Sequence, residues 1–165
     1  MIFVIGSTGK VGRGVVSGLL ERKADVRALA RDPEAAGLPS GLEVVSGDLS
    51  DPRGLTQHLD GVDAVFLVWP FFGDEGAADV VETLARHARR IVYLSAEAAG
   101  HRPDSFWALV ERGIERVASE WTFLRPTGFA VWGVLFAGPL LMPPRVFRTA
   151  AELRDEIKHR RGEKP

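Results

Sequence analysis

The sequence contains no cysteine and only one tyrosine among its 165 residues. Without a thiol, the chain can form no disulfide, offers no thiolate nucleophile and supplies no cysteine ligand to zinc or an iron–sulfur cluster. The absence of cysteine fits a reducing compartment, and we therefore expect a cytoplasmic protein. Any acid chemistry by a phenol would depend on the single tyrosine, Tyr93.

The chain also lacks a dominant charge and a long apolar run. Its formal net charge of -1 gives no general attraction to nucleic acid or to an acidic membrane. The longest apolar stretch, Gly128–Met142, is interrupted by glycine and proline and is shorter than the roughly 20 residues that span a bilayer. The first residues already read as a strand rather than as a leader segment, so secretion is not expected. We expect neither a nucleic acid nor a membrane as partner.

Metal-ligand spacings are absent as well. The four histidines are scattered along the sequence, and none forms a metal-binding pattern with a neighbour. We therefore expect no metal site at His58, His87, His101 or His159. Hydrophobic residues make up 45% and charged residues 26% of the chain, which is ordinary for one folded domain with a single core.

The most informative stretch is the amino terminus. An apolar strand, Met1–Ile5, precedes three glycines spaced three apart, Gly6, Gly9 and Gly12, and an apolar helix follows. Gly6 permits a tight turn, Gly9 leaves room for a phosphate, and Gly12 lets the helix pack closely. The free N–H groups of such a turn and the helix dipole favour a diphosphate, so the pattern predicts a dinucleotide site rather than a purely structural turn. The predicted site comprises Gly6, Ser7, Thr8, Gly9, Lys10, Val11 and Gly12.

Further strand and helix patterns alternate along the chain. The expected strands are Asp25–Ala30, Leu42–Ser46, Val62–Trp69, Ile91–Ser95 and Trp121–Leu124. Helical patterns follow the glycine turn, begin at Asp51-Pro52, and cover Asp74–Arg90 and Phe106–Val117. This alternation, with no hairpin signal or repeat, predicts an α/β fold with a doubly wound parallel sheet covered by helices on both faces.

In such a sheet the ligand lies beyond the carboxyl ends of the strands, at the switch in strand order. The glycine turn, Arg31, Asp48, Trp69 and Ser95 all fall at those ends. Trp69 is a candidate for the nicotinamide pocket, with packing in the core as the alternative. Ser95 is a candidate for the same crevice, with capping of local backbone as the alternative.

Two adjacent residues bear on the choice of nucleotide. An acid after the second strand favours NAD, whereas an arginine there accommodates the extra phosphate of NADP. Arg31 directly follows the strand and can clamp a phosphate with two hydrogen bonds, while Asp32, before Pro33, fits a turn residue. NADP is therefore preferred over NAD, with Arg13 as a possible second cation. Asp48 could accept from the adenine amino group or form an Asx turn.

These residues resemble the atypical short-chain dehydrogenases/reductases of the NmrA-like, or NAD(P)H azoreductase-like, kind. The resemblance extends in order over the first 130 residues. The stretches that carry it are GSTGKVGR (Gly6–Arg13), VRALARDP (Val26–Pro33), VVSGDLSD (Val44–Asp51), GVDAVFLVWP (Gly61–Pro70), IVYLSA (Ile91–Ala96), FWALVE (Phe106–Glu111) and EWTFLRPTGFA (Glu120–Ala130).

The resemblance implies a Rossmann domain over residues 1–130 that binds NAD(P). It implies that the Val68–Pro70 loop lies nearer the nicotinamide, and it supports NADP, since the arginine of an RDP segment commonly faces the 2′-phosphate in this family. The residues that it implies at the adenosine and phosphates are Gly6, Thr8, Gly9, Val11, Gly12, Arg31, Asp48 and Leu49.

The sequence departs from the best-known short-chain dehydrogenases in its catalytic residues. Those enzymes carry a Tyr-x-x-x-Lys pair in which the phenol donates a proton. Here Tyr93 lies within a predicted strand, and the corresponding helix, Phe106–Glu111, contains neither tyrosine nor lysine. Atypical members without the pair act as quinone, azo or flavin reductases or as redox sensors. We expect an NADPH-dependent oxidoreductase for a small conjugated acceptor, with catalytic residues unassigned; the alternative is a non-catalytic NADP(H)-sensing regulator.

The second departure is the short segment after the predicted Rossmann domain. Relatives continue further and build their substrate pocket there, so the substrate-binding part is expected to be truncated. Residues 131–165 read as a short tail: an apolar segment, Val131–Met142, and a charged helix, Thr149–Arg161. The modest basic bias of this tail fits a solvated helix face rather than a nucleic-acid site. The apolar segment could pack on the domain, close a shortened pocket or join two subunits as a homodimer.

Overall fold

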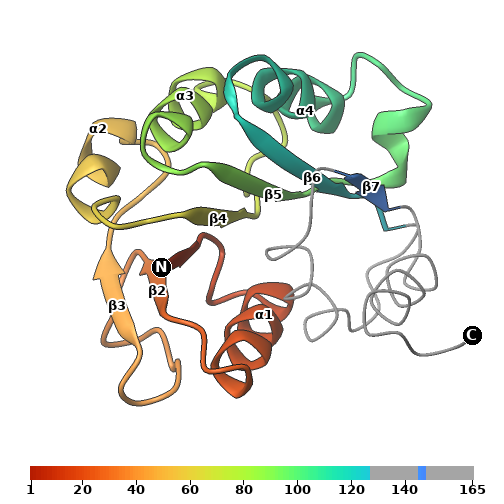
Figure 1. Ribbon diagram of the computed structural model, residues 1–165. Helices are drawn as coiled ribbons and strands as arrows, with labels where there is room; N and C mark the ends of the chain where they lie inside the picture. The colour runs from red at the N-terminus through yellow and green to blue at the C-terminus, as the bar shows by residue number, and fades with distance from the viewer. Residues whose placement is uncertain (127–144, 148–165) are drawn as a thin grey trace, which may run out of the picture.

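All strands of the described chain belong to one parallel sheet. The chain is seen here as a computed structural model that describes residues 1–126 and the backbone of residues 145–147 (Figure 1). The strand order is β3-β2-β1-β4-β5-β6-β7, so the direction of winding reverses between β1 and β4. The strands are β1 (Ile2–Val4), β2 (Val26–Ala30), β3 (Glu43–Ser46), β4 (Ala64–Leu67), β5 (Arg90–Leu94), β6 (Glu120–Leu124) and β7 (Arg145–Phe147).

Helices cover both faces of this sheet. In Figure 1, α1 lies on one side of the strands, and α2, α3 and α4 lie on the other. This arrangement confirms the predicted doubly wound α/β fold. The helices are α1 (Lys10–Glu21), α2 (Pro52–Leu55), α3 (Ala77–His87) and α4 (Phe106–Val117), with short 3-10 turns η1 (Thr56–His58) and η2 (Glu97–Gly100).

The two faces bury separate cores because successive side chains of a strand point in opposite directions. Val4 belongs to the core beneath α1, together with Val15 and Leu19 of that helix. Phe3, its neighbour in β1, belongs to the core beneath the other helices, where it is joined by Leu84 of α3. The apolar periodicity that predicted these helices therefore marks the faces that they bury.

The structure differs from the sequence prediction in one strand and in several element ends. The strand β7 was not predicted; it pairs in parallel with β6, with Arg145 opposite Thr122. The third helix covers Ala77–His87 rather than Asp74–Arg90, and it begins after Gly76 adopts a φ of 78°. The expected apolar segment Val131–Met142, the charged helix Thr149–Arg161 and the boundary at residue 130 lie outside the described residues.

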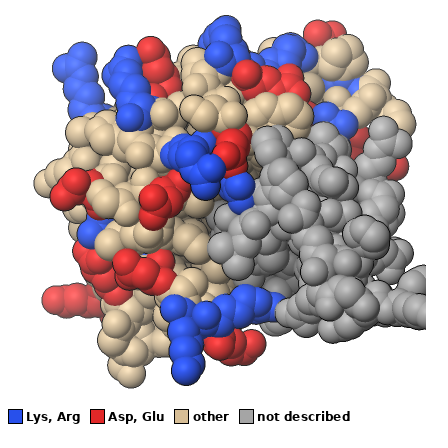
Figure 2. All heavy atoms as spheres, in the orientation of Figure 1, with Lys and Arg blue, Asp and Glu red and all other residues tan. Residues whose placement is uncertain are grey.

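Charges are mixed on the surface drawn in Figure 2. Lysine and arginine side chains alternate with aspartate and glutamate there, so the described part of that face has no continuous basic area. Within residues 1–126, no helix is long and apolar enough to cross a membrane.

Candidate functional site

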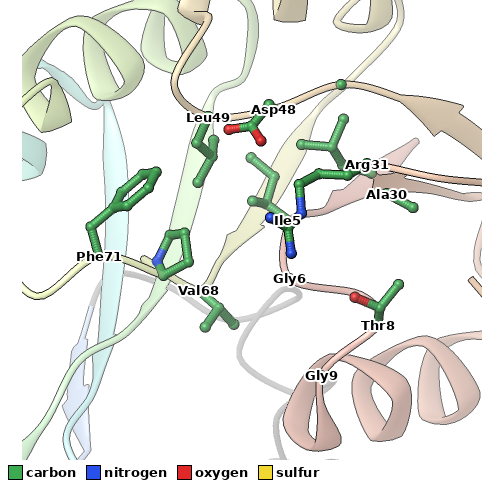
Figure 3. A pocket seen from close by; sticks show the side chains of 13 residues that line it. Ile5, Gly6, Thr8, Gly9, Ala30, Arg31, Asp48, Leu49, Val68 and Phe71 are labelled. Atoms are coloured by element: carbon green, nitrogen blue, oxygen red, sulfur yellow. The ribbon is translucent and has the colours of Figure 1, made fainter.

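A cleft of about 420 Å³ opens at the carboxyl ends of β1, β2, β3 and β4. It lies at the reversal of strand order, where parallel α/β sheets bind ligands. Figure 3 shows the glycine turn on one side and Leu49 with Phe71 on the other. The lining residues are Ile5, Gly6, Thr8, Gly9, Leu29, Ala30, Arg31, Gly47, Asp48, Leu49, Val68, Pro70 and Phe71.

Two of the three glycines of the turn, Gly6 and Gly12, lie where no side chain fits. Gly6 has a φ of 81°, and a Cβ there would lie 2.7 Å from the Cβ of Val68. A Cβ on Gly12 would lie 2.0 Å from the carbonyl oxygen of Gly6, so the first turn of α1 packs directly on the glycine turn. A Cβ added to Gly9 would have the Gly6 oxygen as its nearest atom, at 3.4 Å. The space beside Gly9 is therefore not filled by protein atoms and forms part of the cleft.

The amino terminus of α1 is left open toward an anion. Gly9 is the N-cap residue and supplies no side chain, and the first turn contains no acidic residue. The backbone N–H groups at this end therefore have no capping side chain among the described residues, and the helix dipole adds partial positive charge. Lys10 is exposed at the first helical position, and Val11 beside it is half-buried. A diphosphate satisfies both the open N–H groups and the dipole.

Two of the predicted residues hold the turn rather than line the cleft. The Ser7 side chain is fully buried, and its hydroxyl donates to the carbonyl oxygen of Leu29 at 2.6 Å. This bond joins the glycine turn to β2. Gly12, also buried, makes the close approach described above. Both residues fix the conformation of the glycine turn without lining the cleft.

Arg31 and Asp48 are the charged residues of the cleft lining. Figure 3 shows the Arg31 side chain extending past Ile5 toward Gly6, with Asp48 on the neighbouring loop. Asp48 Oδ1 accepts from the Ser50 N–H at 2.9 Å, and this bond, reinforced by the charge of Arg31, lowers the pKa of the Asp48 carboxyl. The Arg31 guanidinium makes no hydrogen bond or ion pair with the residues that the structure describes, so its donors are available to a ligand.

The neighbouring candidates Asp32 and Arg13 are engaged with backbone. Asp32 Oδ1 accepts from the N–H groups of Glu34 and Ala35, both at 3.1 Å, which makes it the turn residue that the sequence suggested. The Arg13 guanidinium donates to three carbonyl oxygens, so it is not the free second cation considered from the sequence.

Trp69 and Ser95 lie at strand ends without lining the cleft. Trp69 is 7% exposed, belongs to the core beneath α3, and donates from Nε1 to the Gly73 oxygen at 2.7 Å. Of the two readings of Trp69, the structure shows the packed one. Ser95 is fully buried, and within residues 1–126 its hydroxyl has no hydrogen-bond partner.

Sequence reasoning missed the apolar walls of the cleft. Ile5, Leu29 and Phe71 line it, yet each was counted as strand or loop without a role. For Phe71 a signal existed: it follows Val68 and Pro70, which the family resemblance placed near the nucleotide. Phe71 also packs edge-on against Trp69, with ring centroids 5.0 Å apart, so the core tryptophan supports this wall.

On the opposite half of the sheet, the buried acidic groups among the described residues do not face the cleft. The Tyr93 side chain is fully buried in β5, and burial raises the pKa of its phenol. Glu111 of α4 is also buried and forms two hydrogen bonds with Arg125, at 2.9 and 2.5 Å. Neither side chain lines the cleft. Among the described residues, no group of three or more histidine or acidic side chains could hold a metal ion.

Comparisons with known proteins agree with this site. A family model described as NAD(P)H-binding matches residues 6–132. The chain is 33% identical over 144 residues to the NAD(P)H azoreductase of Xenophilus azovorans, covering 82% of this chain and 50% of that protein. It is 39% identical over 138 residues to a (4-alkanoyl-5-oxo-2,5-dihydrofuran-3-yl)methyl phosphate reductase of Streptomyces griseus, covering 78% and 48%. The chain thus spans about half the length of these relatives.

Solved structures share the fold. The triphenylmethane reductase of Citrobacter sp., complexed with NADP(H), superposes with a TM-score of 0.78 at 20% identity, covering 99% of this chain and 77% of that one. An NADPH-dependent quinone oxidoreductase from Escherichia coli gives 0.72 at 18% identity, covering 99% and 76%. With its glycine turn, its cleft at the strand switch and the match over residues 6–132, the chain belongs to the NAD(P)H-binding family.

Proposed function

We propose that this protein binds NADP(H) and catalyses hydride transfer from NADPH to a small conjugated acceptor. The observation that carries the proposal is the cleft at the strand switch. The amino terminus of α1, which has no capping side chain among the described residues, lies at this cleft. The cleft is also lined by Arg31, whose guanidinium makes no hydrogen bond with those residues. Both features favour phosphate, one for the diphosphate and one for a further phosphate on the ribose.

The residues present fit this cofactor. The space beside Gly9 and the N–H groups at the start of α1 would hold the diphosphate, because a side chain at Gly9 would occupy that space. Leu49 and Phe71 offer an apolar wall for a planar base. Arg31 would bind the 2′-phosphate, whereas Asp32, whose Oδ1 accepts from two backbone N–H groups of its own turn, does not line the cleft.

The chemistry that the protein's own residues supply is orientation. The charged groups on the described cleft lining are Arg31 and Asp48, and the lowered pKa of the Asp48 carboxyl keeps that group from donating a proton near neutral pH. When bound, the reduced nicotinamide supplies the hydride. An acceptor whose conjugated system takes up the electrons needs correct placement more than a protein acid, and its proton comes from solvent.

The relatives support a reductase of this kind. One is named as an azoreductase that uses NAD(P)H, and another as a reductase of an unsaturated lactone phosphate. The first name states reduction of an azo group, and the second names a substrate whose ring double bond is conjugated with carbonyl groups. We carry this acceptor class over as part of the proposal.

A second candidate function is nucleotide sensing without turnover. The observation that favours it is the lack of a free acid on the described cleft lining, combined with the burial of Tyr93 and Glu111. To separate the two functions, NADPH is incubated with the protein and a panel of quinones, azo dyes and flavins. Oxidation of NADPH that depends on protein and acceptor supports the reductase. Saturable binding of NADPH without oxidation by any acceptor supports the sensor.

The preference for NADP is tested by replacing the free arginine. Arg31→Ala removes a charge-assisted bidentate contact, and we expect the NADPH affinity to fall about 10- to 100-fold while the NADH affinity changes little. Calorimetric titration measures both constants. Arg86→Ala is the control, because Arg86 is an exposed arginine of α3 that pairs with Glu82 at 2.8 Å and does not line the cleft. Equal losses for the two nucleotides in Arg31→Ala would overturn the assignment.

A further inference from the structure

Arg13 joins two segments that are far apart in the sequence. From the first turn of α1, its Nε donates to the Thr8 oxygen at 2.9 Å, within the glycine turn. Its two terminal nitrogens donate to the oxygens of Ala36 and Gly37 at 2.7 and 2.5 Å. One guanidinium therefore bridges the diphosphate turn and the segment that follows β2.

The segment that Arg13 grips, residues 32–37, directly follows Arg31. It is a compact turn: Asp32 caps two N–H groups, and the Ala36 N–H donates to the Pro33 oxygen at 3.3 Å. Ala36 is 3% exposed, and Gly37 adopts a φ of 57°. Because this turn is closed on itself, holding its far end at Ala36 and Gly37 also restrains its near end at Arg31.

We propose that Arg13 is a positioning residue for NADP recognition: by bridging the glycine turn to residues 32–37, it holds Arg31 at the distance from the diphosphate site that a 2′-phosphate requires. The proposal rests on the proposed function, in which Arg31 binds that phosphate. Arg13 contributes to nucleotide choice through backbone geometry: three of its five N–H donors bond to carbonyl oxygens, and its side chain does not line the cleft.

The planar fork of arginine is suited to this task. Five N–H donors in a fixed geometry can reach carbonyls on two segments at once, whereas a lysine ammonium is a single point of contact at the end of a flexible stem. Replacing Arg13 with lysine therefore retains the charge and loses the bridge. This difference separates a positioning role from direct attraction of the phosphate.

The test measures NADPH and NADH affinities of the wild type, Arg13→Ala and Arg13→Lys by calorimetry. We expect both variants to lose about five- to tenfold in NADPH affinity, with a smaller change for NADH, because preorganisation of Arg31 is lost. A second readout is cleavage after the exposed Glu34 by a glutamate-specific protease under native conditions, which we expect to be faster in both variants. Arg22→Ala is the matched control: Arg22 follows the other end of α1 and also donates to a backbone oxygen, that of Gly18 at 2.6 Å.

The outcomes separate this proposal from the proposed function. If Arg13→Lys keeps wild-type NADPH affinity while Arg13→Ala loses it, Arg13 acts by charge and the positioning role is wrong. If both variants melt at lower temperature but keep the wild-type ratio of NADPH to NADH affinity, Arg13 is merely structural and the positioning role is again wrong. If the wild type shows no preference for NADPH, or Arg31→Ala does not reduce it, the failure lies in the proposed function itself.

Discussion

The two halves of the sheet use their polar residues in opposite ways. In the half formed by β1, α1 and β2, backbone N–H groups and the Arg31 guanidinium remain open toward a cleft. In the half formed by β5, α4 and β6, buried Glu111 is paired with Arg125, and the Tyr93 side chain is fully buried. The first half is organised to receive a charged ligand, and the second to hold its helix on the sheet.

The first half therefore supplies groups that can bind a charged ligand, and the second half supplies no described side chain for acid–base chemistry at the cleft. The corresponding helix of the best-known short-chain dehydrogenases carries a proton donor, whereas α4 begins with Phe106 and Trp107, whose rings pack together at 4.0 Å between centroids. In the proposed function, a reaction at the described cleft would therefore rely on the cofactor and on placement.

The largest effect is expected at the glycine turn. In Gly12→Ala the new Cβ would meet the Gly6 oxygen at 2.0 Å, so α1 must shift away. We expect the free energy of unfolding to fall by about 3 kcal/mol, and the NADPH affinity to fall about 100-fold as hydrogen bonds to the diphosphate are lost. Denaturant unfolding and calorimetric titration measure the two quantities.

The control for this variant lies on α4. An added Cβ on Gly113 meets no atom within 4 Å, so Gly113→Ala should stabilise the protein by about 0.5–1 kcal/mol and leave NADPH affinity unchanged. Wild-type nucleotide affinity in Gly12→Ala would show that the close approach of α1 to the turn is unnecessary for binding.

A smaller effect, confined to stability, is expected in the other half. Glu111→Gln leaves Arg125 without its charged partner, and we expect the free energy of unfolding to fall by about 2–3 kcal/mol. This value is at the low end for a buried pair because the Arg125 side chain is 18% exposed. NADPH affinity should stay within about twofold, since neither residue lines the cleft. Glu82→Gln, which breaks an exposed pair on α3, should cost less than about 0.5 kcal/mol. A large loss of affinity in Glu111→Gln would mean that the two halves are coupled.

The smallest effect concerns a partly buried ion-pair cluster of the second half. Arg90 and Arg89 bond to Glu120 and lower the pKa of its carboxyl below the ordinary value of 4.5. A depressed folded pKa means that the stabilisation is present above pH 4.5 and is lost as the pH falls through the lower folded value. The difference in melting temperature between wild type and Glu120→Gln should thus be larger at pH 7 than at pH 3. A difference that is constant with pH would contradict this account.

Much of the fold could be predicted because its signals are local. Five of the buried strands are apolar runs bounded by glycine, proline or charge, and the α1 and α4 faces repeat with helical spacing. The strand β7 could not be predicted in this way, since its three residues, Arg145–Phe147, have a strand conformation through pairing with β6, which lies far away in the sequence.

Site residues whose role depends on backbone conformation could be predicted from the sequence. Residues whose role depends on the direction of a side chain were harder to predict. The glycine spacing anticipated both the φ of 81° at Gly6 and the close approach at Gly12, because only glycine meets those demands. Trp69 remained ambiguous from the sequence: neighbouring residues at a strand end face opposite ways, and the structure directs Val68 to the cleft and Trp69 to the core. Arg13 remained a candidate for a second cation at the extra phosphate, because the sequence does not show which carbonyl oxygens lie within its reach.

The most direct test of the central claim is calorimetric titration of the native wild-type protein with NADPH and, in parallel, with NADH. The account predicts saturable binding of one nucleotide per chain, with NADPH bound more tightly than NADH. The absence of saturable binding for either nucleotide at millimolar concentration would contradict it.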